Sequence, residues 1–366
     1  MKEKLENLLC KMHERTYCYL IGNGTTGLSI CLQALGLQGR HIGIPNSVCI
    51  NVPLAVLFSE NRPYFLDIQL KDLGISPDEF YSHAKRLDAV IAVHGYGSIC
   101  SISELEEISH NHGIPLIEDA CLALGGYVGG RPIGSFGIAS VISFGVGKPV
   151  NIGHGGAIFT DDPMLFQEIK TIGSKLPPFT IESDHMISMV GKQYTNLYNS
   201  HFGRDLSNHL LSFQKLAFNS KSYFLHQFNG KVQLFLIQTL NKLPEKISLR
   251  WSNLDRFSRN LLYAFPDTFQ ILHPSPGSVP WRLNLLMENR DTALKALHKE
   301  GLHASSWHPQ ASDFFDNCNH SSNTPISAKI GDKILNLWID EEFNDTYLST
   351  SIKIFQRILK MNANEI

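Results

Sequence analysis

Short apolar runs alternate with helix-like stretches between residues 18 and about 160, and this alternation constrains the fold more than any other feature of the chain. Each apolar run is typical of a buried strand, and most are bounded by Gly, Pro or Asp. The runs are HIGIP, RPYFLDI, LDAVIAVHG, GIPLIEDA, ASVISFG and GGAIFTD. The stretches GLSICLQALGL, LAVLFSEN and SISELEEISHNHG between them have helical spacing. This pattern predicts an α/β layer with a largely parallel sheet that helices cover on both faces.

After residue 163 the pattern changes to helix formers and aromatic residues. FLHQFNGKVQLFLIQTLNKL and ISLRWSNLDRFSRNLLYAF are predicted to be long amphipathic helices. The last hundred residues mix strands, VPWRLNLLME and ILNLWID, with the helices RDTALKALHKEG and TYLSTSIKIFQRILKM. A chain of 366 residues is too long for one small core. We therefore predict a large domain over residues 1–240 and a smaller C-terminal α+β domain over residues 241–366, divided near an LPEK turn.

Composition and charge argue against several classes of protein. A net charge of -2 and a pI near 6.8 provide no basic field for nucleic acid or for an acidic membrane. No apolar run approaches the length of a membrane span, and the N-terminus is typical of an amphipathic helix rather than a signal peptide. Seven scattered cysteines without a CxxC pair indicate reduced thiols in a cytoplasmic protein. No Cys/His cluster has the spacing of metal ligands, so no metal is expected.

The first segment that could carry chemistry is GNGTTGLSICLQALGL, residues 22 to 37. A glycine-rich turn opens a helix here, so free backbone N–H groups and the positive end of the helix dipole converge. Gly24, Thr25 and Thr26 are small residues at the point where a phosphate could approach. The segment has neither the lysine of a P-loop nor the GxGxxG of a dinucleotide site. Taken alone, it is more typical of a capped helix without a ligand.

The second segment is GIPLIEDACLALGG, in which Asp119 follows a buried strand. In open α/β sheets, ligands bind at the carboxyl ends of the strands. A carboxylate at that edge can hydrogen-bond a protonated ring nitrogen and stabilise its charge. Asp119 could therefore hold a pyridinium ring as an electron sink. The alternative interpretation is that Asp119 is the N-cap of a helix.

The third segment is GSFGIASVISFGVGKPVNIGHGGAIFT, with Lys148 in a glycine-rich loop after a strand. A lysine in a tight apolar context is costly unless it is paired or used chemically. Desolvation lowers the pKa of an amine, and the neutral amine is the form that makes a Schiff base. Ser143, at the strand end, could reach a phosphate. A solvated surface lysine is the alternative for Lys148 alone, but the three segments together provide the three groups that pyridoxal 5'-phosphate (PLP) requires.

These motifs resemble the DegT/DnrJ/EryC1/StrS family of PLP-dependent sugar aminotransferases of fold type I. The resemblance is carried by the GT turn, IEDAC, the GSFG–SF–K–GHGG block and ILNL. It implies a large domain with a mostly parallel seven-stranded sheet between helices. It also implies that Lys148 is linked to PLP, that Asp119 contacts the pyridine nitrogen, and that Ser143 and the backbone of Thr25 and Thr26 contact the phosphate. A homodimer with the active site at the subunit interface is a further implication.

Four positions depart from the family pattern. Cys49 takes the place of an aromatic residue that often stacks on the cofactor ring, so a smaller, softer contact is expected. Leu122 stands where many members have Gln or His near the phenolic oxygen. The family's stretch near the substrate also departs, since it is SSWHPQ here and keeps only His308 and Pro309 of the pattern. The phosphate contact from the neighbouring subunit falls within residues 201 to 216, where the register leaves Arg204 and Asn208 as alternatives.

The predicted function is transfer of an amino group from glutamate or glutamine to a keto-sugar, which the resemblance implies is nucleotide-linked. The alternative is a catalytically altered PLP-binding member with a different PLP reaction or a regulatory role, because the departures fall at cofactor and substrate contacts. Lys148 argues against the dehydratase branch of the family, in which histidine replaces the lysine. A dinucleotide-binding protein is set aside because the glycine fingerprint is absent.

Overall fold

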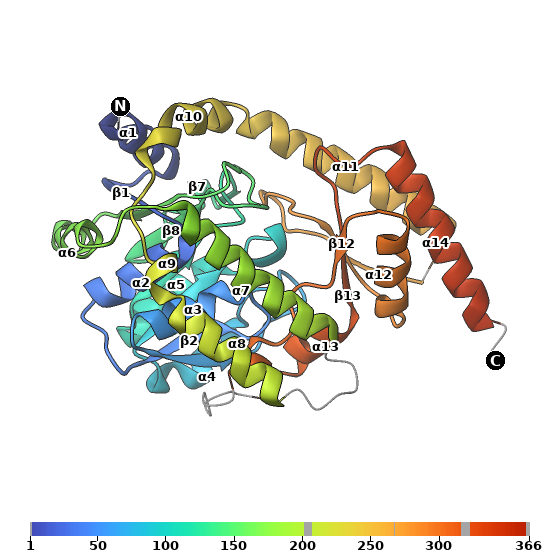
Figure 1. Ribbon diagram of the computed structural model, residues 1–366, viewed down its shortest axis with the longest axis horizontal. Coiled ribbons are helices and arrows are strands. Elements are labelled where there is room, and N and C mark those ends of the chain that lie inside the picture. Colours follow the sequence, from blue (N-terminus) through green and yellow to red (C-terminus); the bar gives the residue numbers. More distant parts are fainter. Residues whose placement is uncertain (1, 201–206, 267, 316–322, 364–366) are drawn as a thin grey trace.

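The computed structural model describes residues 2–200, 207–266, 268–315 and 323–363. Its centre is a seven-stranded sheet in the order β1-β9-β8-β5-β4-β2-β3. Helices surround this part of the molecule (Figure 1). The other six strands run in one direction and β9 alone runs in the opposite one, which confirms the predicted mostly parallel sheet. The strands are β1 (Tyr17–Ile21), β2 (His41–Pro45), β3 (Arg62–Leu66), β4 (Ala89–Val93), β5 (Leu116–Asp119), β8 (Ala139–Ser143) and β9 (Gly156–Thr160).

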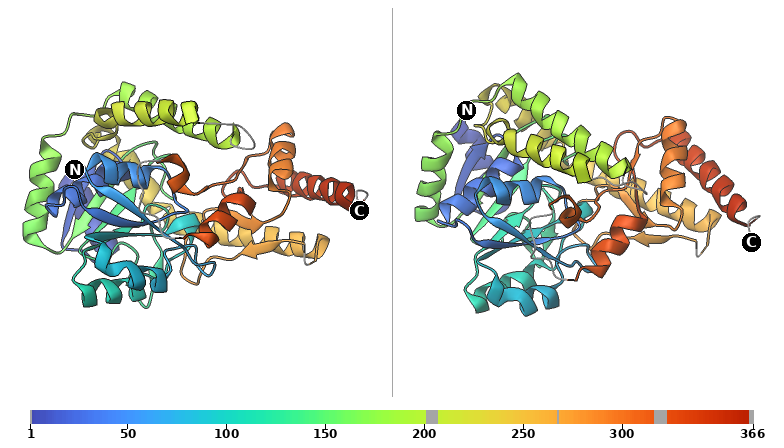
Figure 2. Two further views of the ribbon diagram at one scale, coloured as in Figure 1. Left: turned by 90° about the horizontal axis from the view of Figure 1, so that it is seen from below. Right: turned by 60° about the horizontal axis from the view of Figure 1, so that its bottom comes forward.

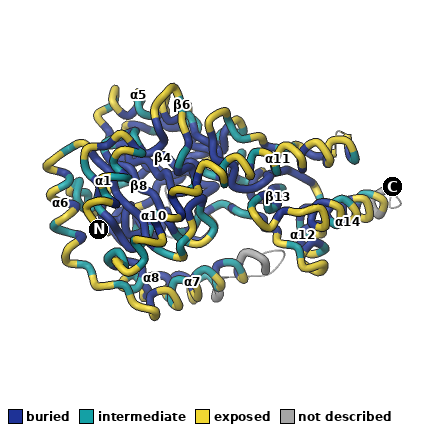
Figure 3. The backbone as a smooth tube through the Cα atoms, turned by 90° about the horizontal axis from the view of Figure 1, so that it is seen from above, coloured by how far each residue is buried: buried dark blue, intermediate teal, exposed yellow. Residues whose placement is uncertain are grey.

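Helices cover both faces of this sheet, as the continuous apolar strands predicted. Every residue of β4 is buried, because its side chains alternate between two helical layers. One layer contains α2 (Gly24–Ala34), α3 (Asn51–Phe58), α6 (Pro163–Ser174), α7 (Ile181–Ser200) and α8 (Ser207–Asn219). The other contains α1 (Lys2–His13), α4 (Pro77–His83), α5 (Ile102–His112) and α10 (Gln233–Asn241). Exposed residues lie mainly on the outer sides of the helices (Figure 3).

The C-terminal part forms an α+β lobe with its own core, as predicted. A four-stranded antiparallel sheet, in the order β10-β11-β13-β12, packs against α11, α12 and α14, and α11 runs from the large lobe to the small one (Figure 1). These elements are β10 (Gln270–Leu272), β11 (Leu283–Leu286), β12 (Ala304–Ser305), β13 (Ile334–Leu337), α11 (Leu243–Ala264), α12 (Arg290–Lys299) and α14 (Asp345–Ala363). The small hairpin of β6 (Tyr127–Val128) and β7 (Arg131–Pro132) belongs to the large lobe.

A segment of the C-terminal part returns to the large lobe. Phe314 and Phe315 belong to the core on the α2–α3 face of the large sheet. The carboxylate of Asp67, which follows β3, accepts hydrogen bonds from the Ile326 and Ser327 N–H groups in the first turn of α13 (Pro325–Lys333). Figure 2 shows α13 against the large lobe. The division at residues 240 and 241 remains a prediction.

Two local predictions were wrong. FLHQFNGKVQLFLIQTLNKL is not one helix, because Asn229 caps a short 3-10 turn, Gly230–Val232, and α10 begins only at Gln233. The LPEK segment is not a turn. It forms the first residues of α11, where Pro244 is tolerated because the N–H groups of the first helical turn have no intrahelical acceptor.

The described residues show no helix with the length and apolar character needed to cross a membrane. Six of the cysteines lie in the described ranges, and all six are free thiols. Within the same ranges, no group of three or more His, Cys, Asp or Glu side chains is arranged to hold a metal ion.

Candidate active site

Three parallel strands bring the chemistry-bearing segments to one edge of the sheet. β1, β5 and β8 share one direction, so their carboxyl ends lead into α2, the turn after Asp119 and the Lys148 loop at the same edge. A Cβ atom placed on Gly24 would lie 2.9 Å from the Cys121 Sγ and 3.4 Å from the Ser143 Cβ. The start of α2 therefore packs directly against the ends of β5 and β8, and only glycine leaves space there.

The N-terminus of α2 provides two N–H groups that have no acceptor within the described part of the chain. Asn23 is the N-cap, and its Oδ1 accepts a hydrogen bond from the Thr26 N–H at 2.9 Å. Gly24 and Thr25 occupy the first two helical positions, whose N–H groups have no partner within a helix. Those two N–H groups can bind a phosphate. Thr26, by contrast, supports the cap, and its Oγ1 donates to the Phe224 carbonyl at 2.8 Å. The asparagine directly before GTT is the sequence signal for this cap.

Asp119 ends β5 and is buried. Its Oδ1 accepts a hydrogen bond from the Cys121 N–H at 3.0 Å, and a turn follows, so the alternative of a helix N-cap is wrong. The preceding Glu118 points to the opposite face of the sheet, as strand alternation requires. There its two oxygens accept the N–H groups of Gly134 and Phe136 at 2.7 and 2.8 Å. Glu118 is therefore structural, and Asp119 is the carboxylate at the site edge.

Lys148 lies in a glycine-rich loop just beyond β8. Its side chain is half-buried, so the surroundings are more open than predicted, and the neighbouring Val146 is 80% exposed. The Lys148 N–H donates to the Gly145 carbonyl at 3.2 Å, and Gly147 has a φ of +77°, which favours glycine. Ser143 is buried at the start of this loop, and its hydroxyl accepts the Gly145 N–H at 3.3 Å.

The charges of Lys148 and Asp119 both influence the pKa values of two thiols, Cys49 and Cys121. Burial raises the pKa of Cys49, while the Lys148 charge lowers that pKa and the Asp119 charge raises it. Burial likewise raises the pKa of Cys121, with Asp119 again raising and Lys148 lowering it. The two charges therefore lie within electrostatic range of one pair of side chains. The sequence predicted a contact for Cys49 but missed Cys121, whose signal is its place two residues after Asp119.

His308 reaches this site from the C-terminal part of the chain. Its ring stacks on Trp281, with ring centroids 6.3 Å apart and planes 7° from parallel. Burial, and then the nearby Lys148 charge, lower the pKa of His308 to about 3, so the ring is neutral at pH 7. The buried Nδ1 has no hydrogen-bond partner within the described structure. The predicted substrate residue thus lies close to Lys148 and presents an unused polar atom.

Leu122 is partly buried and packs against an apolar cluster. The cluster includes Tyr96, Trp281 and Trp307. The Tyr96 hydroxyl lies 2.6 Å from the Ser47 Oγ and accepts the His308 N–H at 2.9 Å. Tyr96 and Ser47 were missed by the sequence analysis. The signal for Tyr96 is the HGYG segment directly after a strand.

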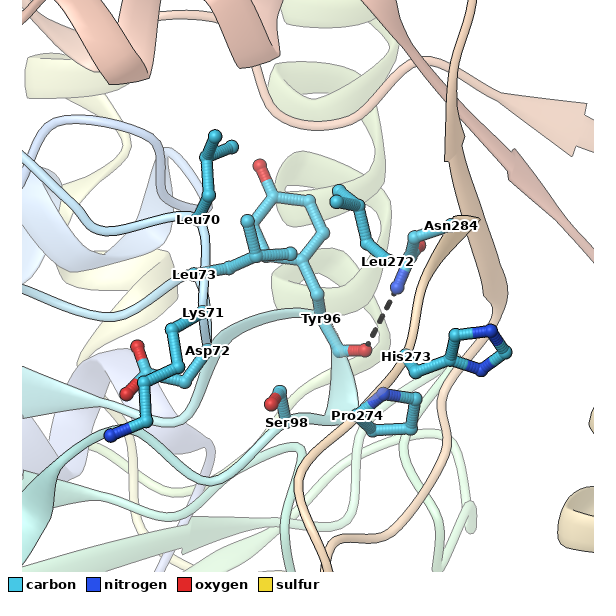
Figure 4. Close-up of a pocket in the computed structure, with 10 residues that line it drawn as sticks. All are labelled: Leu70, Lys71, Asp72, Leu73, Tyr96, Ser98, Leu272, His273, Pro274 and Asn284. Atoms are coloured by element: carbon cyan, nitrogen blue, oxygen red, sulfur yellow. Dashed lines mark hydrogen bonds between the residues drawn. The ribbon is translucent and has the colours of Figure 1, made fainter. Parts of the chain in front are cut away.

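A small pocket lies beside the Tyr96 backbone (Figure 4). The Tyr96 carbonyl accepts a hydrogen bond from the Asn284 side chain at 3.3 Å along its wall. None of the predicted site residues lines it. The lining residues are Leu70, Lys71, Asp72, Leu73, Tyr96, Ser98, Leu272, His273, Pro274 and Asn284.

The residues at the sheet edge fit PLP. A helix N-terminus with two free N–H groups suits the phosphate, a buried strand-end carboxylate suits the ring nitrogen, and a lysine lies on the adjacent loop. Arg204 and the side chain of Asn208 lie outside the described residues, so the predicted contact from a neighbouring subunit stays a prediction.

The family model described as the DegT/DnrJ/EryC1/StrS aminotransferase family matches residues 1–355. The chain belongs to this family. Among curated relatives, the GDP-perosamine synthase of Vibrio cholerae is 31% identical over 150 residues, which are 40% of this chain and 41% of that protein. The L-glutamine:scyllo-inosose aminotransferase of Streptomyces griseus is 33% identical over 147 residues, which are 40% of this chain and 35% of that protein. The chain thus matches about two fifths of the length of these relatives.

Solved structures extend the likeness over the whole chain of this DegT/DnrJ/EryC1/StrS member. DesI, determined in the presence of its TDP-sugar product, superposes with a TM-score of 0.78 at 21% identity. The match covers 99% of this chain and 86% of that one. Together with the seven-stranded sheet, this confirms the predicted fold, which is that of the fold type I aminotransferases.

Proposed function

We propose that this protein is a PLP-dependent aminotransferase that moves an amino group from glutamate or glutamine to a nucleotide-linked keto-sugar. The observation that carries the proposal is the convergence of Lys148, Asp119 and the free N-terminus of α2 at one sheet edge. The matches to a GDP-perosamine synthase and to a glutamine-dependent inosose aminotransferase support the substrate class.

Each residue has a separate role in this proposal. The N–H groups of Gly24 and Thr25 bind the phosphate, with Ser143 beside them. The Asp119 carboxylate holds a proton on the ring nitrogen, because an opposite charge favours the protonated form. When bound, PLP supplies an electron-poor ring that stabilises negative charge at the carbon bearing the amino group. The Lys148 Nζ would hold the cofactor covalently, and its free amine would act as acid and base for the proton on the carbon that bears the donor's amino group.

Cys49 and Leu122 would contact the cofactor with side chains that differ from those of many family members. Cys49 gives a small, polarizable contact in place of a ring, and Leu122 presents carbon atoms where a hydrogen bond would otherwise form. His308, neutral and unpaired at Nδ1, is positioned to contact the substrate. The exposed Val146 beside Lys148 supports a second subunit that covers the site, as a homodimer would. We place the protein in the cytoplasm on the basis of its free thiols.

The test uses the purified protein saturated with PLP. The protein is incubated with glutamate or glutamine labelled with 15N in the amino group, and with a panel of nucleotide-linked keto-sugars. Mass spectrometry should find the label on a sugar product. The variant Lys148→Ala should lose this transfer, whereas Lys175→Ala, at an exposed position at the end of α6, should keep it. Cofactor binding without transfer from either donor to any sugar would favour the altered family member instead.

A further inference from the structure

A tryptophan from the C-terminal lobe holds the lysine loop. The indole N–H of Trp281 donates a hydrogen bond to the Gly147 carbonyl at 3.0 Å, one residue before Lys148. Trp281 and Gly147 are far apart in the sequence, so the bond connects the two lobes at the candidate active site. The Trp281 side chain is almost fully buried and Gly147 is partly exposed, so this bond is partly shielded from water.

Trp281 is itself fixed on three sides. A Cβ atom on Gly97 would lie 2.3 Å from the Trp281 backbone nitrogen, so the two backbones are in close contact. The Arg282 guanidinium lies 4.9 Å from the Trp281 ring centroid and donates to the Asp340 carboxylate at 3.0 Å. The His308 ring stacks on the indole from another side. The tryptophan therefore cannot move without disturbing the lobe interface.

Side-chain packing restrains the loop only weakly at Gly147, although the loop contains the hydrogen bonds from the Gly145 N–H to Ser143 and from the Lys148 N–H to Gly145. Gly145 and Gly147 bracket Val146, whose side chain is 80% exposed. A Cβ atom on Gly147 would have no neighbour within 4 Å, so side-chain packing does not fix the backbone there. A glycine-rich backbone without packing has many accessible conformations. A hydrogen bond to the carbonyl of Gly147 is thus well placed to select one of them.

We propose that Trp281 is a positioning residue that fixes the Lys148 loop so that the Lys148 amine faces the Asp119 edge of the site. This role rests on the proposed function for its catalytic consequence, but the restraint of the loop can be measured without cofactor. A misplacement of about 1 Å in a reacting group costs roughly 100-fold in rate, so a fixed loop matters for amine chemistry.

The first experiment compares Trp281→Phe with Trp251→Phe. Both variants keep an aromatic ring and lose an indole N–H bond to a carbonyl, since Trp251 donates to Ser278 at 3.2 Å. Trp251 thus provides the matched control, because its bond does not involve the Lys148 loop. In cofactor-free protein, amide hydrogen exchange in the peptide spanning residues 144–152 should be about fivefold faster in Trp281→Phe than in Trp251→Phe. Equal exchange in the two variants would overturn the proposal, whatever the protein catalyses.

With PLP and substrates, Trp281→Phe should lower kcat roughly tenfold while the KM for the amino donor changes less than about threefold. Wild-type protein that binds no PLP would contradict the proposed function, but the exchange experiment would still test the role of Trp281. If Trp281→Phe does not fold, the indole 15N–1H signals of the wild type decide the question. In cofactor-free wild type, the Trp281 indole proton should exchange slowly with solvent, because it is held in the hydrogen bond to the Gly147 carbonyl. Exchange as fast as in the unfolded chain would overturn the proposal.

Discussion

The change Tyr96→Phe removes one buried hydroxyl that connects three segments of the site. The Tyr96 hydroxyl lies 2.6 Å from the Ser47 Oγ, after β2, and accepts the His308 N–H at 2.9 Å. Phenylalanine keeps the ring and its packing against His308, so the change is confined to the hydroxyl. The backbone conformation of Tyr96, with a φ of +60°, costs the same in both proteins.

The structure sets the size of the effect. Ser47 keeps a second partner, because its hydroxyl also donates to the His308 carbonyl at 3.2 Å. The buried His308 N–H loses the acceptor that Tyr96 provides, and an unsatisfied buried donor costs about 1–3 kcal/mol. We therefore expect Tyr96→Phe to lower the free energy of unfolding by about 2 kcal/mol.

Urea denaturation followed by circular dichroism measures this difference. The matched control is Tyr263→Phe, since Tyr263 is 92% exposed and its hydroxyl faces water. That control should stay within about 0.5 kcal/mol of the wild type. If Tyr96→Phe unfolds at the same urea concentration as Tyr263→Phe, the hydroxyl does not stabilise the site in the way described.

Two further predictions concern buried groups. Burial lowers the pKa of His13 to about 4, although the Ile133 carbonyl partly opposes the shift. Between about pH 6.5 and 4, His13 therefore binds a proton in the unfolded chain but not in the folded protein. The free energy of unfolding decreases as the pH is lowered through this range. Urea titrations at a series of pH values give the free energy of unfolding as a function of pH. The slope of that plot should be smaller by up to about 1.4 kcal/mol per pH unit in His13→Asn than in the wild type, and an unchanged slope would refute the burial effect. Gly97→Ala should lower the melting temperature more than Gly36→Ala, because both positions have positive φ but only the Gly97 Cβ would contact backbone, at 2.3 Å from Trp281. Equal losses would show that strain in φ, not the close approach, dominates.

Local patterns were sufficient to predict the large sheet. The strands from residues 41 to 160 are buried on both faces, so each appears in the sequence as an uninterrupted apolar run with helices between. The same reasoning predicted the places of Asp119 and Lys148, because both follow such runs at the carboxyl end of a strand. Short-range signals therefore determine which residues reach the sheet edge.

Contacts between distant segments could not be predicted in the same way. The Trp281–Gly147 and Tyr96–His308 hydrogen bonds join residues more than a hundred positions apart, and no periodicity in the sequence indicates such pairs. Thr26 looked equivalent to Gly24 and Thr25, but the Asn23 cap takes its N–H group. The stretch before Gln233 has helical spacing, yet Asn229 and Gly230 favour a turn that ends the pattern.

The central claim is that Lys148 is the residue that binds PLP covalently. The direct test is to reduce the PLP-saturated protein with borohydride, digest it and locate the phosphopyridoxyl group by mass spectrometry. We predict that the group is found on the peptide that contains Lys148 and is absent from the same peptide of Lys148→Ala. Attachment to a different lysine, or no stable attachment in the wild type, would contradict the account.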